Sequence, residues 1–362
     1  MKKGIFIMAA IAAIVCSCEP ENDCLPCQEE KTATLNVSLD FEDDTQTKAT
    51  SYVTSQTYET AVNNVQILVF DSTGALNAYV DADKSVAGIT INTTTGSKTV
   101  WAVVNGPDLS SVTTIGGMTA KTIDLGDNST TASAGFVMAG STTCTVSSST
   151  TTAIITVNRF VSRVALAKVT NSLPDSYGSL TVNNVTLTNV VGNQNLAGAA
   201  TPSTWYNKMG RKDGATASSQ IIDGSSYLAS CPTLTFKSIS SSVANGSSLT
   251  PSTPYLLYCY PNNTTTDATG WASSFTARKT RLVVTATISG TKYYYPVVID
   301  APQRNTAYTV ELTITGLGST DPDKPVEKGT ISAIVSVQGW ASGAVYEETI
   351  QHFINLFKST KQ

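Results

Sequence analysis

The segment Val-Gln-Ile-Leu-Val-Phe, at residues 65–70, decides the fold. It is rich in β-branched and aromatic residues, the turn Asp-Ser-Thr-Gly follows it at 71–74, and a second extended run covers residues 75–80. Two short runs of this kind, joined by a turn that contains glycine, are typical of a β-hairpin. The amino-terminal half of the chain is therefore expected to be built from β-strands.

Short strands separated by turns are also expected on both sides of this hairpin. These further runs lie at 33–39, 88–92, 98–105, 135–139, 153–157, 159–169, 180–191, 233–239, 255–260, 280–288, 293–299, 307–315 and 326–337. Turn residues at such short spacing indicate a sandwich or barrel and not alternating strand–helix units. Only the tail at 350–362 has helical spacing, which predicts a short surface helix there. We predict an all-β chain with few short helices.

Length and composition limit the number and the kind of domains. The chain has 362 residues and a mass of 38.0 kDa, enough for about two domains. Charged residues make up 14% of the chain and hydrophobic residues 41%, a balance that disfavours intrinsic disorder. The segment 171–174 is the expected boundary, which gives one β-sandwich domain at 49–170 and a second at 171–362.

Charge and histidine content argue against two classes of function. The formal net charge is −4, and the basic residues are too scattered to form a stripe along a nucleic acid. The single histidine, His352, leaves almost nothing for a histidine base or a histidine-rich metal site. No acid/base pair or nucleophile motif stands in a recognisable setting. We therefore expect no enzyme activity, no cofactor, no metal and no nucleic-acid partner.

The amino terminus has the features of an export signal. Two lysines precede an apolar run at residues 5–15, which is too short to span a bilayer. Val15-Cys16-Ser17-Cys18 then resembles a bacterial lipobox, so residues 1–17 are the expected lipoprotein signal peptide and Cys18 the lipidated residue. Acyl chains such as palmitate hold a protein at the membrane by about 0.8 kcal/mol per buried CH₂. A plain secretory signal with an incidental cysteine is the alternative.

No function is expected of the other cysteines. Cys24 and Cys27 form a single CxxC without a second pair, which does not support zinc or thioredoxin chemistry. A bridge between Cys231 and Cys259 would suit an oxidising compartment, and buried free thiols are at least as good an interpretation.

Two segments far apart in the chain show a strict two-residue alternation. The apolar face of the first consists of Ala33, Leu35, Val37 and Leu39. The apolar face of the second consists of Ile331, Ala333, Val335 and Val337, with Ile334 as the one apolar residue on the opposite side. Both segments are predicted to be strands with one buried face. Alternation alone also allows each to be an ordinary strand of its own domain.

Several short stretches, taken in order, resemble the type V pilin family of Bacteroidales, the FimA-like fimbrillins. The matching stretches are 65–71, 100–105, 136–138, 157–159, 163–165, 293–297, 304–308, 316–325 and Trp340. The resemblance covers nearly the whole mature chain and implies two transthyretin-like β-sandwich domains in tandem. It further implies a structural subunit of a cell-surface fimbria that supports adhesion and biofilm formation.

The same resemblance implies a maturation pathway. A lipoprotein precursor reaches the outer membrane, and a trypsin-like protease cuts after a basic residue past the first strand, here between Lys48 and Ala49. The oral members carry Arg at that point, so Lys48 leaves the identity of the protease open. Residues 18–48 would then be a lipidated propeptide that takes an edge strand with it, and the mature form would lie in extracellular fimbriae.

Loss of the first strand would leave a groove that another strand could fill. Each large side chain uncovered costs about 1.5 to 3 kcal/mol. Residues 331–337 of a neighbouring molecule have the same apolar spacing and could enter this groove by β-strand addition, with the whole donor region at about 326–346. Such addition is head to tail and yields a filament. The expected partners are further copies of the chain, fimbrial anchor and tip subunits, and the maturation protease.

Three alternatives stay open. A tip or accessory adhesin would receive a donor strand but need not supply one, and a membrane-retained anchor would lack the Lys48 cleavage point. A surface glycan-binding lipoprotein would instead stack aromatic side chains on sugars, with candidates Trp101, Trp205, Trp271 and Tyr293–Tyr295. Processing separates these functions, because a glycan binder would stay whole and lipidated whereas a pilin would begin at Ala49.

Overall fold

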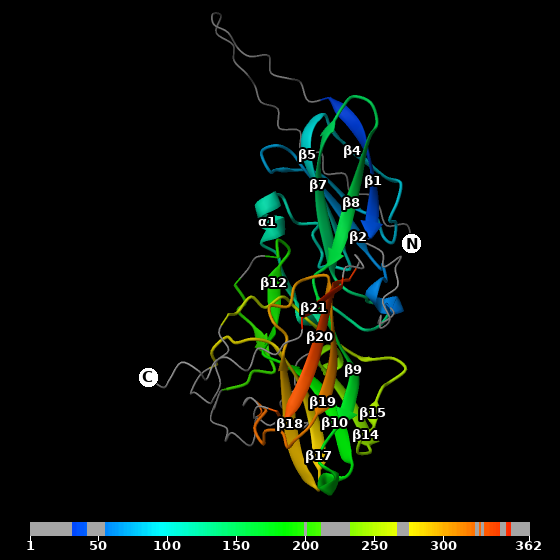
Figure 1. Cartoon of the computed structure of the whole chain (residues 1–362). Coiled ribbons are helices and arrows are strands. Elements are labelled where there is room, and N and C mark those ends of the chain that lie inside the picture. The colour runs from blue at the N-terminus through cyan, green and yellow to red at the C-terminus, as the bar shows by residue number, and fades with distance from the viewer. Residues whose placement is uncertain are drawn as a thin grey trace, which may run out of the picture.

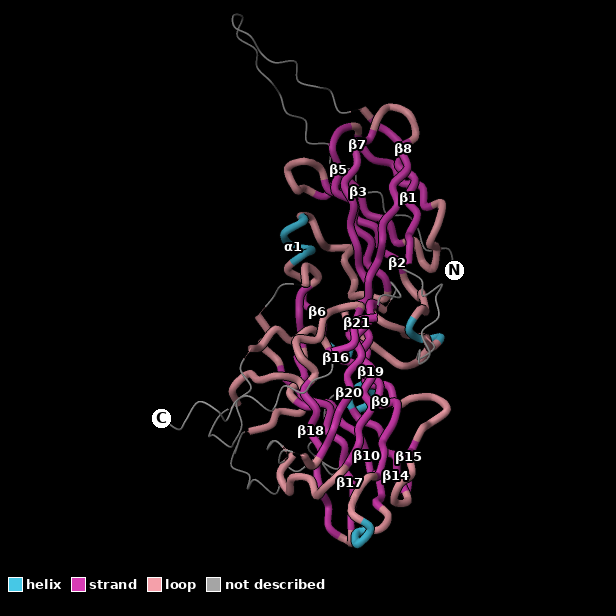
Figure 2. The backbone as a smooth tube through the Cα atoms, in the orientation of Figure 1, coloured by secondary structure: helices cyan, strands magenta, loops and turns pink. Residues whose placement is uncertain are grey.

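The computed structural model describes residues 31–41, 55–198, 201–210, 232–265, 275–322, 326, 329–340 and 345–348. Strands dominate this part of the chain, and its few helices are short (Figures 1 and 2). The prediction of an all-β protein with few short helices is therefore confirmed. Among the described residues, no helix is both long and apolar enough to cross a membrane.

The amino-terminal half contains one long sheet that is folded over on itself. Its strand order is β3-β2-β5-β7-β8-β1-β4. The strands are β1 (Thr32–Phe41), β2 (Val65–Phe70), β3 (Leu76–Asp81), β4 (Ile89–Thr94), β5 (Gly96–Val104), β7 (Met138–Val146) and β8 (Thr151–Arg159). The sheet turns between β7 and β8, which pair only at Met138–Arg159 and Ala139–Asn158. Alternate residues from both layers then enclose an apolar core.

A glycine permits the close approach of β7 and β8. A Cβ atom on Gly140 would lie 1.9 Å from the carbonyl oxygen of Thr156. No side chain fits there, because real Cβ atoms do not approach a backbone oxygen so closely.

The carboxyl-terminal half contains two further sheets. The first has the order β14-β10-β17-β18 and the second the order β15-β9-β19-β20-β21, with β16 also paired to β9. Their bounds are β9 (Ser162–Asn171), β10 (Leu180–Thr188), β14 (Phe236–Val243), β15 (Ser248–Leu249), β16 (Tyr255–Cys259), β17 (Arg281–Ile288), β18 (Thr291–Val298), β19 (Thr306–Ile314), β20 (Ile331–Gly339) and β21 (Val345–Glu348). Apolar residues of both sheets form one buried cluster, and that cluster continues onto the outer face of β2 at Leu68 and Phe70.

Short elements lie between the two halves and at their ends. They are η1 (Thr57–Glu59), α1 (Ile115–Thr119), β6 (Thr122–Asp124), η2 (Leu125–Asp127), η3 (Asp175–Tyr177), β11 (Val190–Val191), β12 (Asn193–Asn195), β13 (Trp205–Tyr206) and α2 (Pro232–Thr235). β6 pairs with β12, and β11 pairs with β13. In Figure 1 the β12 segment lies between the upper and the lower sheets, so this ladder ties the two halves together.

Several expected elements differ from those observed. The expected edge strand, β1, lies inside its sheet with β4 on one side and β8 on the other. β9 pairs with β15, β16 and β19 of the second half, although it precedes the boundary expected at residue 171. β21 was not predicted as a strand, and the predicted tail helix at 350–362 lies outside the described residues. The division at residue 171 stays a prediction.

Candidate functional site

The first candidate segment, β1, occupies a slot between two strands. Residues 32–37 pair antiparallel with β4, and residues 35–41 pair parallel with β8. Leu35 and Val37 are completely buried, Ala33 is 8% exposed, and Leu39 packs against the core while partly exposed. The four residues that share the predicted face therefore do point into the core. The slot that β1 fills has two hydrogen-bonding edges, and burial of Leu35 and Val37 alone contributes about 3 to 6 kcal/mol.

The second candidate segment, β20, lies in its own sheet in the other half of the molecule. It pairs antiparallel with β19 from Ile331 to Gly339, and residues 335–338 also pair with β21. Val335 is buried, whereas Ile331, Ala333 and Val337 are partly buried and pack against the carboxyl-terminal core. Ile334, on the opposite side, is 46% exposed. The predicted faces of β20 are thus the observed ones, and the strand is seated on its own subunit.

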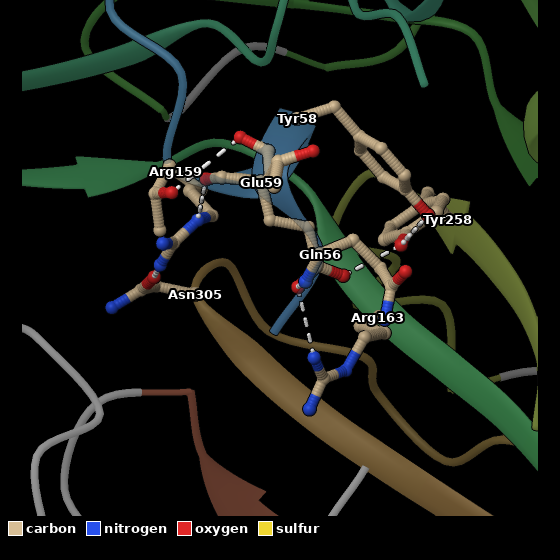
Figure 3. Close-up of polar contacts among 9 residues, drawn as sticks. Gln56, Tyr58, Glu59, Arg159, Arg163, Tyr258 and Asn305 are labelled. Atoms are coloured by element: carbon tan, nitrogen blue, oxygen red, sulfur yellow. Dashed lines mark hydrogen bonds and ion pairs between the residues drawn. The ribbon is translucent and has the colours of Figure 1, made fainter. Parts of the chain in front are cut away.

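A buried polar cluster joins the segment that follows β1 in the chain to the carboxyl-terminal half (Figure 3). Its centre is the carboxylate of Glu59, which is fully buried. Oε2 accepts hydrogen bonds from Arg163 Nη1 at 3.0 Å and from the backbone N–H of Gln56 at 2.8 Å, and Oε1 accepts from the Tyr258 hydroxyl at 2.6 Å. The Glu59 carbonyl oxygen accepts from Arg159 Nε at 2.6 Å. Glu59 is therefore held by groups from three separate strands and from its own turn.

Aromatic rings cover this cluster. The ring of Trp340, which directly follows β20, stacks on Tyr258 with centroids 6.0 Å apart and meets Phe136 edge-on at 6.2 Å. The guanidinium carbons of Arg159 and Arg163 lie 4.7 and 5.0 Å from the centroid of the same indole. Such cation–π contacts are stronger when water is excluded, and Trp340 is 1% exposed. Trp340 therefore anchors the end of β20 in the junction between the two halves.

The two tyrosine hydroxyls of the cluster are held protonated. Burial, and next the charge of Glu59, raises the pKa of Tyr258 far above its ordinary value. Burial is also the largest cause of the raised pKa of Tyr58, whose hydroxyl lies 3.0 Å from that of Tyr258. Since Tyr258 donates to Glu59, Tyr58 is the donor in the pair of hydroxyls. The two hydroxyls and the Glu59 carboxylate therefore form a hydrogen-bonded chain that holds the junction together.

The remaining predicted residues fall into two groups. Cys18, Lys48 and Ala49 lie outside the described residues. Cys259 is a buried free thiol, and Cys144 is free and partly exposed. The described residues contain no group of three or more histidine, cysteine or acidic side chains that could hold a metal ion.

Most of the aromatic residues suggested for sugar binding are occupied in packing. Tyr294 and Tyr295 are buried, and the ring of Trp205 lies 5.4 Å from that of Phe275. Trp271 lies outside the described residues. Trp101 is half-buried and borders an open hollow.

The cluster of Glu59, Arg159 and Arg163 was not predicted from the sequence. Arg159 and Arg163 belong to stretches that resemble the fimbrillin family, whereas Glu59 belongs to none of them. The one sequence feature that could have indicated Glu59 is a carboxylate just before the apolar strand β2 in a chain with few charged residues.

A protein family and several solved structures are similar to this chain. The sequence model of the family described as major fimbrial subunit protein (FimA) matches residues 33–204, a range that begins inside β1. No curated protein matches the chain. A putative cell adhesion protein from Bacteroides eggerthii aligns with a TM-score of 0.59 and 18% identity, covering 86% of this chain and 96% of that one.

Two fimbrial proteins from Porphyromonas gingivalis share the same architecture. The fimbrilin FimA aligns with a TM-score of 0.55 and 12% identity over 85% of this chain and 98% of that one. The tip fimbrial protein Mfa3, with a carboxyl-terminal truncation, aligns with a TM-score of 0.51 and 14% identity over 86% of this chain and 100% of that one. At these identities the likeness shows a shared fold.

Proposed function

This chain belongs to the FimA family of fimbrial subunits, and we propose that it is the repeating subunit of a cell-surface fimbria that polymerises head to tail by donor-strand exchange. Its partners are further copies of the chain together with anchor and tip subunits, and the fibre supports adhesion and biofilm formation. The observation that carries the proposal is the position of β1, an early strand that completes the core of a sheet built from later residues. In this proposal the two β-sandwiches act in tandem, one accepting a strand and the other supplying one.

Export and cleavage prepare the subunit for assembly. Cys18 takes the lipid that holds the precursor at the outer membrane, and a trypsin-like protease cuts between Lys48 and Ala49. In sequence, Lys48 lies after the end of β1 at Phe41 and before η1 at Thr57. A cut there divides β1 from the rest of the chain, while η1 and the Glu59 cluster stay with the mature subunit.

β20 of a neighbouring subunit then takes the place of β1. Both strands carry four small or branched apolar side chains on one face, at Ala33–Leu39 and at Ile331–Val337. Their lengths also agree, with ten residues in β1 and nine in β20. A strand that enters the slot satisfies the backbone groups of β4 and β8 and covers the pockets of Leu35 and Val37.

Cleavage is tested with two lysines that flank β1. The full chain is treated with a lysine-specific protease, followed by amino-terminal sequencing and electron microscopy. The variant Lys48→Gln should give no fibres, whereas Lys31→Gln should assemble like the parent because Lys31 precedes β1. Fibres of the Lys48→Gln variant that still contain residues 33–39 would overturn the proposed maturation.

Donor-strand exchange is tested with nearby positions on opposite faces of β20. Val337→Asp places a charge on the apolar face and should abolish fibres, whereas Ile334→Asp, on the exposed face, should leave them intact. Val337 suits this test better than the buried Val335, because it is partly exposed in the free subunit. Circular dichroism of both variants checks that the monomer is folded, and fibres of normal length from folded Val337→Asp would contradict the exchange.

A further inference from the structure

A hollow of about 500 Å³ lies where the amino-terminal sheet meets the carboxyl-terminal half. Its wall includes Trp101 of β5, Ser141 of β7, Asn158 of β8, and Arg304 and Asn305 from the turn before β19. Arg304 is the one charged residue among the described residues of the wall, and no carboxylate lies among them. The hollow therefore carries positive charge without a built-in counter-ion.

Arg304 is fixed in place but not neutralised. Its Nη2 donates to the carbonyl oxygens of Ala139 at 3.3 Å and Asn158 at 3.1 Å, and the guanidinium carbon lies 4.2 Å from the centroid of the Phe160 ring. Its Nε is buried and has no hydrogen-bond partner, and no carboxylate of the described chain lies within ion-pair distance of the guanidinium. Burial lowers the pKa of Arg304, because no anion offsets the loss of water around the charge. An immobilised guanidinium with unused donors is the group that proteins use to bind a carboxylate.

The other wall residues suit hydroxyl groups and an apolar ring face. The amides of Asn158 and Asn305 are joined, because Asn305 Nδ2 donates to Asn158 Oδ1 at 2.9 Å, and Asn305 Oδ1 accepts from Arg159 Nη1 at 3.1 Å. Asn158 thus presents an amide held in place by Asn305, and Ser141 supplies a hydroxyl on an exposed position. The half-buried Trp101 borders the same space, and its indole N–H is buried without a partner. An aromatic face beside amides and hydroxyls can contact both the C–H side and the hydroxyl side of a sugar. The volume lies within the range of about 300 to 1,000 Å³ that small-molecule sites occupy.

We propose that this hollow binds an acidic sugar, a pyranose ring that carries a carboxylate. Arg304 receives the carboxylate, the Asn158 amide and the Ser141 hydroxyl receive ring hydroxyls, and Trp101 packs against the apolar face of the ring. A neutral sugar would leave the guanidinium without an anion, and an inorganic anion would leave most of the hollow empty. The lining contains no residue of β1 or β20, so binding can be measured on the unassembled chain, although Thr156 of the wall pairs with Asp40 of β1.

Binding is measured on the full chain by isothermal titration with D-glucuronate, with D-glucose and inorganic phosphate as the comparison probes. Glucuronate should bind saturably, and both comparison probes at least tenfold more weakly. Ser141→Glu places a competing carboxylate in the hollow and should weaken glucuronate binding at least tenfold. Thr143→Glu is the matched control, because Thr143 is also exposed on the same face of β7 but does not line the hollow, and its affinity should stay within twofold.

Three results would overturn the acidic-sugar site. They are equal affinity for glucose, equal affinity for phosphate, and equal affinity of the Ser141→Glu and Thr143→Glu variants for glucuronate. A second variant, Thr156→Glu, adds a carboxylate to the wall at an exposed position of the neighbouring strand β8. Thr156→Glu should weaken glucuronate binding as much as Ser141→Glu does, so the test still gives a result if one of the two variants misfolds. Thermal melting establishes which variants are folded.

Discussion

Replacement of Glu59 by glutamine should destabilise the subunit far more than its small change of shape suggests. Glu59 is fully buried, and the guanidinium of Arg163, which is 1% exposed, donates to it at 3.0 Å. Removing one partner of a buried ion pair leaves an uncompensated charge in a dry site, which costs about 3 to 5 kcal/mol. The amide of the new side chain could still turn its oxygen toward Arg163, and the Tyr258 hydroxyl can rotate to accept from the amide nitrogen. The hydrogen bonds are thus partly kept, so we expect a loss near the lower limit, about 3 kcal/mol.

The free energy of unfolding is measured by urea titration of the full chain, with circular dichroism as the probe. Glu311→Gln is the control, because Glu311 is a partly exposed carboxylate on β19 that forms no ion pair within the described part of the chain. It should change the free energy by less than about 1 kcal/mol. The double variant Glu59→Gln, Arg163→Met also removes the guanidinium charge that Glu59→Gln leaves unpaired. It should therefore be more stable than Glu59→Gln alone.

A free energy of unfolding for Glu59→Gln within about 1 kcal/mol of the parent value would refute this prediction. A double variant that is less stable than Glu59→Gln alone would also refute it, because that result would mean that the two charges do not interact. If a variant changes the slope of the unfolding free energy against urea concentration, the compactness of its denatured or native state has changed. The stabilities of variant and parent are then compared through the hydrogen-exchange protection of β9.

Three further predictions concern other parts of the fold. Trp340→Ala should lower the free energy of unfolding by about 3 to 5 kcal/mol, because a fully buried ring is lost, and urea titration measures this. Gly140→Ala should lower the melting temperature sharply, because its Cβ would lie 1.9 Å from the Thr156 carbonyl oxygen. Gly290→Ala is the control, since Gly290 has a φ of +81° but no atom within 4 Å of a Cβ, and it should lower the free energy of unfolding by only about 1 kcal/mol. Cys259 should resist alkylation at pH 8 until the protein is unfolded, because burial raises the pKa of its thiol to about 12 and leaves almost no thiolate. Mass spectrometry of native and denatured samples measures the alkylation.

The individual strands could be predicted from sequence because their signal is local. The alternation at 33–39 correctly identified Leu35 and Val37 as buried, and that at 331–337 identified the inward Val335 and the exposed Ile334. A two-residue period reports which face is buried, but it does not report which strands lie alongside. For that reason the sequence predicted the face of β1 and not its position between β4 and β8.

The Glu59 cluster could not be predicted from sequence because its contacts are long-range. Arg163 lies 104 residues from Glu59 along the chain and Tyr258 lies 199 residues away. No local pattern of apolar and polar residues indicates contacts between such distant residues, because these contacts form only when the two halves pack together. The same holds for Arg304, whose hydrogen-bond acceptors on Ala139 and Asn158 are 165 and 146 residues distant.

The internal position of β1 changes how the proposed exchange must proceed. An edge strand leaves by breaking one ladder, whereas β1 is hydrogen-bonded to β4 along one side and to β8 along the other, with Leu35 and Val37 fully buried. A cut at Lys48 breaks one peptide bond and none of these contacts, so it would leave β1 in its slot. Release then requires either partial opening of the sheet or an incoming β20 that replaces the ladders pair by pair as β1 departs. The second route never exposes the whole slot to water, and it therefore avoids the roughly 3 to 6 kcal/mol of apolar burial that complete release of β1 would forfeit. On this argument the neighbouring subunit is needed for the departure of β1 as well as for its replacement.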